Sequence, residues 1–170
     1  MKRSVFIYFI FLALLSFSVL AKDAIELTTA SSGVVGKINV KAGESVKKGQ
    51  LLLALDQRVY KAKLDEAITM LKGVEMQFEE SKKELERAEE LYERTVLSDH
   101  ELNIAKVDFA KAEGLFKQSE REKIEAQYNF DHSQLLAPFK GKIKSVFAFP
   151  GMLVNNQLKS TVLLTMEITN

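Results

Sequence analysis

The feature that most constrains this fold is a long helical segment, residues 57–131. It contains no proline, its only glycines are Gly73 and Gly114, and it is dense in Glu, Lys, Leu and Ala. Its apolar and small residues recur at alternating spacings of four and three, the heptad pattern of helices that pack along one seam. The first seam comprises Tyr60, Leu64, Ala67, Leu71, Val74, Phe78, Ser81, Leu85, Ala88 and Tyr92, and the second comprises Leu102, Ala105, Phe109, Ala112, Phe116 and Ser119, followed with weaker fit by Ala126 and Phe130.

The two seams are expected to pair antiparallel, as the arms of one hairpin. The pairs Tyr92 with Leu102, Leu85 with Phe109 and Phe78 with Phe116 share the same sum of residue numbers, as an antiparallel register requires. Near Lys123 this register fails, and Ile124 and Tyr128 are expected to take over the seam. Arms of about 35 to 40 residues would extend roughly 50 to 60 Å.

A capping sequence locates the reversal between the two arms. Ser98 and Glu101 form a capping box, in which each side chain satisfies a backbone N–H of the other residue. Leu97 and Leu102 stand where a hydrophobic staple is found, before and after this cap. Residues 95–96 are therefore left for the turn itself.

Short β-strand patterns flank the helical segment on both sides. The stretch Gly36-Lys37-Ile38 is followed by Gly43, Val46 and Gly49, and the stretch Gly141-Lys142-Ile143 is followed by Gly151, Val154 and Gln157. Glycine supplies the positive φ at which strands reverse, and Pro150-Gly151 is the sequence of a type II turn. Each half is too small to bury a core by itself, so the two halves are expected to form one β-sandwich. Asp56 is expected to cap the first helix, which would join strand and helix without a loop.

The N-terminus has the pattern of a secretory signal. Lys2 and Arg3 precede an uncharged run over residues 4–21, with Val19 and Ala21 at the −3 and −1 positions of a cleavage site. The sequence therefore predicts a signal peptide over residues 1–21. An uncleaved membrane anchor is the alternative, since the run is about as long as the shortest membrane spans. Either way, the body of the protein is expected outside the cytoplasm.

Composition and residue pairing exclude several classes of function. The chain has no Cys, and its net charge of +1 gives no electrostatic case for nucleic acid. His100 and His132 stand at opposite ends of the second arm, too far apart to share a metal. No Ser/His/Asp cluster or carboxylate pair stands out from the heptad background. We therefore expect no enzymatic activity, no metal site and no cofactor.

A β-sandwich of the lipoyl type, split by a helical hairpin behind a signal peptide, resembles the periplasmic adaptor subunits, or membrane fusion proteins, of tripartite efflux pumps. The matching stretches are SGVVGKINVKAGESVKKGQLLLALD before the hairpin and LLAPFKGKIKSVFAFPGMLV after it. The resemblance implies an α+β fold, a barrel-sandwich hybrid split by an antiparallel coiled coil. Its parts would be residues 22–56, the hairpin over residues 57–131, and residues 132–170.

The hairpin tip adds a third match to this family. Arg87, Leu91 and Ser98 have the spacing of the R-x3-L-x6-S motif with which such adaptors dock onto a TolC-type outer-membrane channel. The resemblance implies that these three residues contact the channel. It also implies a homo-oligomer in the periplasm, coupled to an inner-membrane transporter or a companion adaptor subunit.

The chain departs from the typical family pattern in one respect, and two alternative functions remain open. Typical adaptors continue into a β-barrel and a membrane-proximal domain, whereas this sequence ends at Asn170. We therefore expect a short form without these domains, which is a minimal adaptor, one that needs a companion subunit, or the product of a truncated reading frame. A regulator that occupies the channel without a pump is one alternative function. A biotinyl- or lipoyl-type carrier is another, with Lys61 near the position of a modified lysine, although helix replaces the tight hairpin that would present it.

Overall fold

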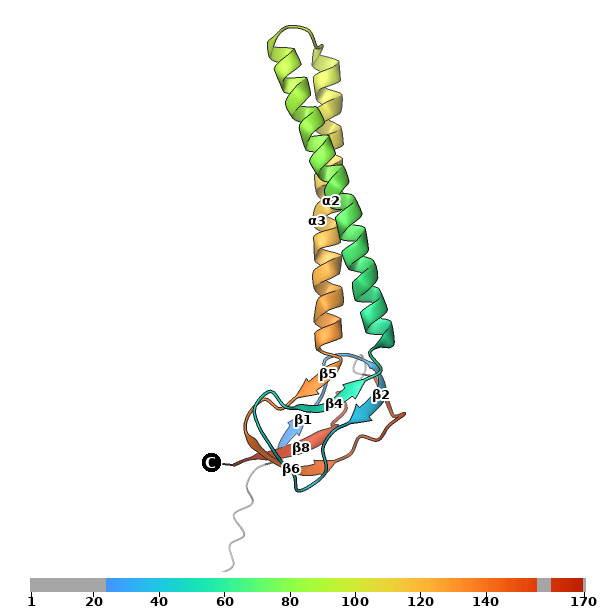
Figure 1. The fold of residues 1–170 in the computed structure, drawn as a ribbon, viewed down its shortest axis with the longest axis vertical. Helices are drawn as coiled ribbons and strands as arrows, with labels where there is room; N and C mark the ends of the chain where they lie inside the picture. Colours follow the sequence, from blue (N-terminus) through green and yellow to red (C-terminus); the bar gives the residue numbers. More distant parts are fainter. Residues whose placement is uncertain (1–23, 156–159, 170) are drawn as a thin grey trace, which may run out of the picture.

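The computed structural model describes residues 24–155 and 160–169. The chain forms a β domain from which a long α-helical hairpin projects (Figure 1). The hairpin consists of α2, Arg58–Glu93, and α3, Asp99–Asp131, which stand between β4 and β5 in the sequence. With 36 and 33 residues, the helices are about 54 and 50 Å long. The predicted signal peptide lies outside the described residues, and none of the described helices is long and apolar enough to span a membrane.

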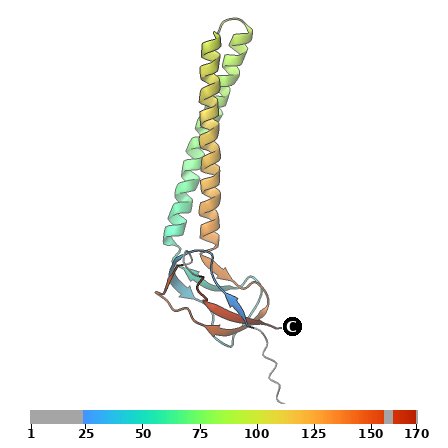
Figure 2. The same cartoon turned by 180° about the vertical axis from the view of Figure 1, so that it is seen from behind.

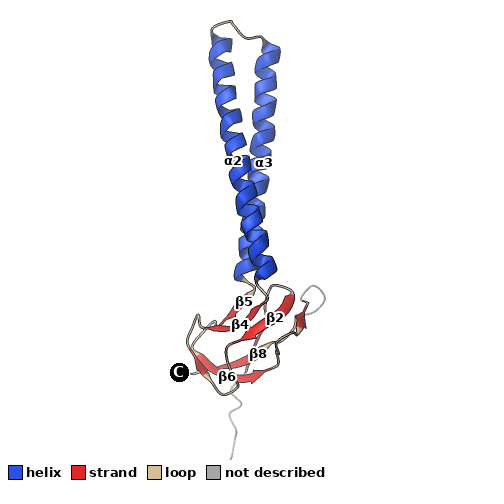
Figure 3. Ribbon diagram, turned by 45° about the vertical axis from the view of Figure 1, so that its right-hand side comes forward, coloured by secondary structure: helices blue, strands red, loops and turns tan. Residues whose placement is uncertain are grey.

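Within the described residues, eight short strands form the β domain, and all the pairings between them are antiparallel. They are β1 (Ile25–Leu27), β2 (Gly33–Ile38), β3 (Ser45–Val46), β4 (Leu51–Leu55), β5 (Gln134–Leu136), β6 (Gly141–Val146), β7 (Leu153–Val154) and β8 (Leu164–Ile168). One sheet has the order β1-β8-β6-β3 and the other β5-β4-β2-β7, and the two lie beneath the hairpin (Figure 3). Each sheet takes two strands from each side of the hairpin, so the two halves of the sequence form one sandwich, as expected.

The two halves are related by an internal repeat in which β2 corresponds to β6. These strands begin at Gly33 and Gly141, which are 108 positions apart, and Gly43 and Gly151 have the same separation. The hydrogen bonds repeat as well, because the N–H of Gly43 donates to the carbonyl of Ile143 at 2.8 Å and that of Gly151 donates to Val35 at 2.8 Å. Each half of the β domain therefore hydrogen-bonds from its glycine turn to the equivalent strand of the other half.

This repeat corrects one sequence correspondence. The two Gly-Lys-Ile stretches are 105 positions apart, and the first ends β2 whereas the second begins β6. They are therefore not structurally equivalent. At Gly141 a Cβ would stand 2.4 Å from the carbonyl oxygen of Glu167. Glycine is therefore required at this position, because two strands approach closely there.

The predicted turns and the core under them are present. Gly151 has φ of +89°, and the N–H of Met152 donates to the carbonyl of Phe149 at 3.1 Å, as in a type II turn around Pro150-Gly151. Val46 and Val154 are buried under their turns, as predicted, whereas Gln157 lies outside the described residues. The core is completed by Leu27, Val35, Val40, Leu52, Leu53, Leu55, Ala137, Ile143, Ala148, Leu163, Leu164 and Met166.

The hairpin follows the predicted heptad seam over almost its whole length. In α2 the residues that are at least partly buried are all members of the predicted seam, from Tyr60 to Ala88, while Tyr92 is exposed. Phe78 stacks on Phe116 with ring centroids 5.0 Å apart, which confirms the predicted register. In both Figure 1 and Figure 2 the two helices cross along their length, as heptad packing requires.

Near the base of α3 the sequence prediction of the seam was wrong. Ile124 and Tyr128 are 65% and 51% exposed, so they do not take over the seam. The original spacing continues instead through Lys123, Ala126 and Phe130, which are all partly buried. A lysine can occupy such a position because its aliphatic stem packs while its ammonium group reaches water.

Candidate functional site

A tight backbone turn closes the tip of the hairpin. The N–H of Val96 donates to the carbonyl of Leu91 at 3.0 Å, and the N–H of Thr95 donates to that of Tyr92 at 2.9 Å. This pair of bonds is the Schellman motif, which usually has glycine at the position of Thr95. Thr95 adopts φ of +60°, an unfavourable conformation for a β-branched residue. The tip is therefore compact and its backbone is strained at one residue.

The second helix begins with the predicted capping box. The N–H of Glu101 donates to the Ser98 Oγ at 3.3 Å, and the N–H of Ser98 donates to the Glu101 carboxylate at 3.0 Å. The Ser98 hydroxyl also donates to this carboxylate at 2.7 Å, and these bonds lower the pKa of Glu101. Leu102 is buried and Leu97 is half-buried, as in the predicted staple. Ser98 thus fixes the shape of the tip through its capping bonds.

A side-chain bond across the turn was not foreseen from the sequence. The Tyr92 hydroxyl donates to the Asp99 carboxylate at 2.7 Å and thereby joins the end of α2 to the start of α3. This bond, together with the charge of Asp99, raises the pKa of Tyr92. The sequence position of the two residues could have predicted this bond. Tyr92 is the last seam residue of one arm, and Asp99 is the first helical residue of the other.

The structure places Arg87, Leu91 and Ser98 at the end of the hairpin that lies away from the β domain. Arg87 and Leu91 are four residues apart and so lie on the same face of α2. The Leu91 side chain is 40% exposed, and Val96 beside it in the turn is 69% exposed. Arg87 is ion-paired with Glu84, an exposed pair of the kind that contributes little to stability. The tip therefore presents apolar and charged groups suited to binding another protein.

At the base of the hairpin, Asp56 differs from its predicted role. The N-cap of α2 is Gln57, which has helical dihedral angles and makes no capping bond with its side chain. Asp56 stands one residue earlier, accepts from the N–H of Arg58 at 3.1 Å and pairs with the Arg58 guanidinium. The bonds to Arg58 lower the pKa of Asp56 to about 2. Strand and helix are still joined by only two residues.

A segment between β1 and β2 ties the β domain to both helices. The Thr29 hydroxyl donates to the carbonyl of His132 at 2.7 Å, at the end of α3. The Tyr60 hydroxyl, in the first turn of α2, donates to the carbonyl of Ser32. These bonds hold both arms against the β domain, so the direction of the hairpin is fixed at its base.

The described residues hold no group of three or more His, Cys, Asp or Glu side chains placed to bind a metal ion. His100 and His132 lie at the two ends of α3, as the sequence predicts.

Comparison with known proteins supports the fold and identifies a protein family that shares it. The family described as RND MFP, barrel-sandwich hybrid domain, matches residues 23–166. The multidrug resistance protein MdtA of Pectobacterium atrosepticum is 27% identical over 126 residues, which cover 74% of this chain and 31% of that protein. The corresponding protein of Pectobacterium carotovorum is 26% identical, with 30% of its length covered.

Two solved structures share the fold at lower identity. MacA from Actinobacillus actinomycetemcomitans has a TM-score of 0.70 at 23% identity, over 86% of this chain and 49% of that one. A MacA-MexA chimera that contains the Pseudomonas aeruginosa MexA α-hairpin domain has a TM-score of 0.63 at 23% identity, over 85% of this chain and 46% of that one.

The chain spans about a third of the length of the curated relatives that it matches. The family match nevertheless covers most of this chain, including both halves of the sandwich and the hairpin between them. The chain therefore belongs to the RND membrane fusion proteins, with their barrel-sandwich hybrid domain split by an α-helical hairpin.

Proposed function

We propose that this protein is a periplasmic adaptor of a tripartite efflux system, which docks by its hairpin tip onto a TolC-type outer-membrane channel. It would help to couple that channel to an inner-membrane transporter, directly or through a companion subunit. Membrane fusion proteins are non-enzymatic adaptors, which agrees with the expectation that the chain is not an enzyme. The observation that carries the docking proposal is the exposed tip, held far from the β domain by two rigid helices (Figure 1).

The architecture supports action at a distance. The base of the hairpin is fixed by the two-residue junction after β4 and by the bonds from Thr29 and Tyr60. The arms then carry the tip about 50 Å outward. Leu91 offers an exposed apolar contact, and Arg87 offers planar donors suited to carbonyls or carboxylates at the ends of partner helices. A contact at the tip would thus be transmitted to the β domain without a flexible linker.

The alternative carrier function has weaker support. Lys61 lies in the first turns of α2 and is exposed, but it is a helical residue. A carrier lysine would stand at a tight turn between two strands, and the hairpin occupies that place in this chain. Mass spectrometry of the mature protein tests the point, since an acyl or biotinyl adduct on Lys61 would favour the carrier.

The location is part of the same proposal. A periplasmic adaptor requires export, and cleavage before Lys22 would release a chain that begins KDAIEL. N-terminal sequencing from fractionated cells tests this. Recovery of the intact Met1 segment from the membrane fraction would replace the released form by an anchored one.

Substitution at the tip tests the docking role. In cells that carry the variant as their only copy, we expect Arg87→Asp and Leu91→Asp to abolish crosslinking to the channel and resistance to exported compounds. Expression and melting should be unchanged, because both side chains are exposed and such substitutions usually cost within about 0.5 kcal/mol.

Matched controls lie near the base of the hairpin. Arg121→Asp also removes an exposed arginine that is ion-paired with a glutamate, and Ile124→Asp also places a charge at an exposed apolar position. Both should leave crosslinking and resistance intact. Full crosslinking and resistance in Arg87→Asp and Leu91→Asp would remove the docking role and leave Ser98 as a helix cap alone.

A further inference from the structure

The tip end of the hairpin carries charge of predominantly one sign. Residues 84–108 include eight Asp or Glu and three Lys or Arg, a net charge of −5, whereas the whole chain has a net charge of +1. This excess of acidic side chains is not needed for helix formation, which the heptad seam and the cap already explain. Opposite charges on two protein surfaces speed their association and select the partner, so an acidic end favours a partner with basic side chains.

Within this stretch, a groove of about 340 Å³ lies between the two helices. Ala88 and Ala105 both line it, and their small side chains leave space along the seam. Ile104, which is 47% exposed, and the half-buried Leu97 add apolar surface. The groove is therefore an apolar slot open to solvent, near the tip.

The polar lining of the groove is acidic. It includes the carboxylates of Glu84, Glu101 and Asp108 and includes no Lys or Arg. Ser81 also lines the groove, and its buried hydroxyl oxygen has no hydrogen-bond partner among the described residues.

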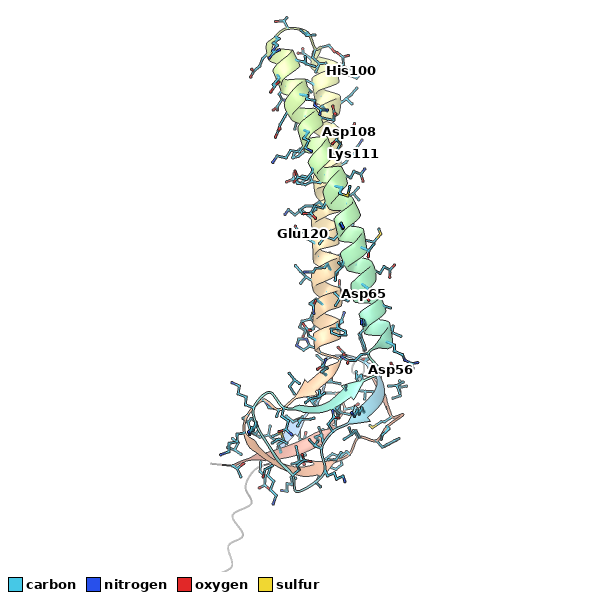
Figure 4. All side chains as sticks on the ribbon, in the orientation of Figure 1. Asp56, Asp65, His100, Asp108, Lys111 and Glu120 are labelled. Carbon is cyan, nitrogen blue, oxygen red and sulfur yellow. The ribbon has the colours of Figure 1, made fainter. Side chains whose placement is uncertain are left out.

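Two of the three carboxylates of the groove remain available to a partner. Asp108 is paired with Lys111 at 3.0 Å, and Glu84 with Arg87, but both pairs are exposed and such pairs exchange at little cost. Asp108 and Lys111 are labelled in Figure 4 on α3, below His100 at the tip. Glu101 is engaged in the cap with Ser98 and contributes its charge.

We propose that this groove receives a Lys or Arg side chain from the end of a partner helix. Such a side chain has an aliphatic stem that fits an apolar slot, and a cationic head that donates to carboxylates. The inference rests on the proposed function, in which the partner is the outer-membrane channel. It places the contact on the groove between the helices, on Ile104 and Asp108 of α3, in addition to the extreme tip.

Photocrosslinking in intact cells tests the position of the contact. A photoreactive residue is placed in turn at Ile104 in the groove, at Leu91 on the tip, and at Ile124 near the base as a control. The crosslinked peptides are identified by mass spectrometry. We expect positions 104 and 91 to capture the channel, with a Lys or Arg within about one helical turn of the residue that position 104 captures. Position 124 should not capture it.

Charge reversal tests the electrostatic part. Asp108→Lys should lower the yield of the channel crosslink at position 104 by about tenfold or more, since close interfacial charge pairs carry large coupling energies. Asp65→Lys changes the net charge equally but lies near the base of α2, as Figure 4 shows, and should leave the yield unchanged. Asp108→Asn, which introduces no repulsion, should lower the yield less, and circular dichroism checks the helical content of each variant.

The outcomes separate the two proposals. Capture of the channel at position 91 but not at 104, or an equal yield in Asp108→Lys and Asp65→Lys, would overturn the groove and leave the docking tip in place. Capture at 104 of a channel segment without a nearby Lys or Arg would also overturn it. Failure of every tip position to capture the channel would remove the proposed function, and the groove with it.

Discussion

The β domain and the hairpin bury their apolar residues in different ways. In the β domain, Leu52, Leu53, Leu163, Leu164 and Met166 are fully buried, although the hairpin separates the first two from the others in the sequence. In the hairpin, α2 buries a single residue, Leu64, and α3 buries Leu102, Ala112 and Ser119. One region has a closed core built from distant segments, and the other has a narrow seam built from neighbouring turns.

This difference in burial assigns different roles to the two regions, one to stability and the other to binding. A core that needs both halves of the chain unfolds as a unit, because removal of any strand exposes the others. A seam between two helices can open locally, but it leaves most of the helix surface free for partners. The β domain therefore anchors the hairpin, and the hairpin presents the surface that we propose binds the channel.

The largest effect is expected in the closed core. Leu164→Ala removes a fully buried side chain and should lower the free energy of unfolding by about 2–5 kcal/mol. Hydrogen exchange measured by mass spectrometry should show loss of protection in strands of both sheets together. The control Leu153→Ala, at a position 71% exposed, should change stability by less than about 0.5 kcal/mol. Loss of protection confined to β8 would contradict a single cooperative core.

A smaller and more local effect is expected in the seam. The Phe78 ring stacks on Phe116, and its centroid lies 5.6 Å from that of Phe109. Phe78 nevertheless remains partly exposed. Phe78→Ala should therefore cost about 1–3 kcal/mol, below the loss for a fully buried phenylalanine. Exchange should accelerate in α2 and α3 and stay unchanged in the strands. Met76→Ala, on the exposed face of the same helix, is the control, and equal acceleration in the β domain would show that the two regions unfold together.

At the tip, a stabilising substitution is expected. Thr95→Gly relieves an unfavourable positive φ, and after the entropy loss of glycine the gain should be about 0.5–1 kcal/mol. The melting temperature of the helical signal should rise. Val96→Gly, the next residue in the same turn, gains nothing of this kind and should lower it. A fall in melting temperature for Thr95→Gly would mean that the Thr95 side chain stabilises the tip.

The smallest effect concerns pH. The bond from Tyr92 to Asp99 raises the pKa of Tyr92, so its contribution to stability is complete below about pH 10 and is lost as the pH rises through the higher folded value. Asp99→Asn should return the pKa of Tyr92 toward its ordinary value. Ultraviolet titration of the phenolate, with Tyr92→Phe to assign the signal, measures the shift, and an unchanged titration in Asp99→Asn would exclude the bond in solution.

Local rules predicted most of the hairpin. The pairing of Phe78 with Phe116 and the capping box at Ser98 were read from spacing, because helix contacts repeat with a fixed period. The errors arose where local rules conflict. Ile124 and Tyr128 were placed in the seam on hydrophobicity, but the helix period puts Lys123 there. The candidate site was also predicted only in part. The capping role of Ser98 was predicted from the sequence, whereas the bond between Tyr92 and Asp99 was not.

The sequence by itself determined the two helices, most of the heptad seam, the cap and the glycine turns, because each depends on residues within a few positions of one another. The tertiary structure alone decided how β2 pairs with β7 and β3 with β6, and that Gly33 rather than Gly36 corresponds to Gly141. It also decided that Thr95 adopts positive φ and that Ala88 and Ala105 leave a groove between acidic side chains. The strand pairings depend on the distance and direction between segments that lie far apart in the chain, so no local spacing encodes them. The φ of Thr95 and the groove depend instead on how closely the two helices pack on each side of the turn.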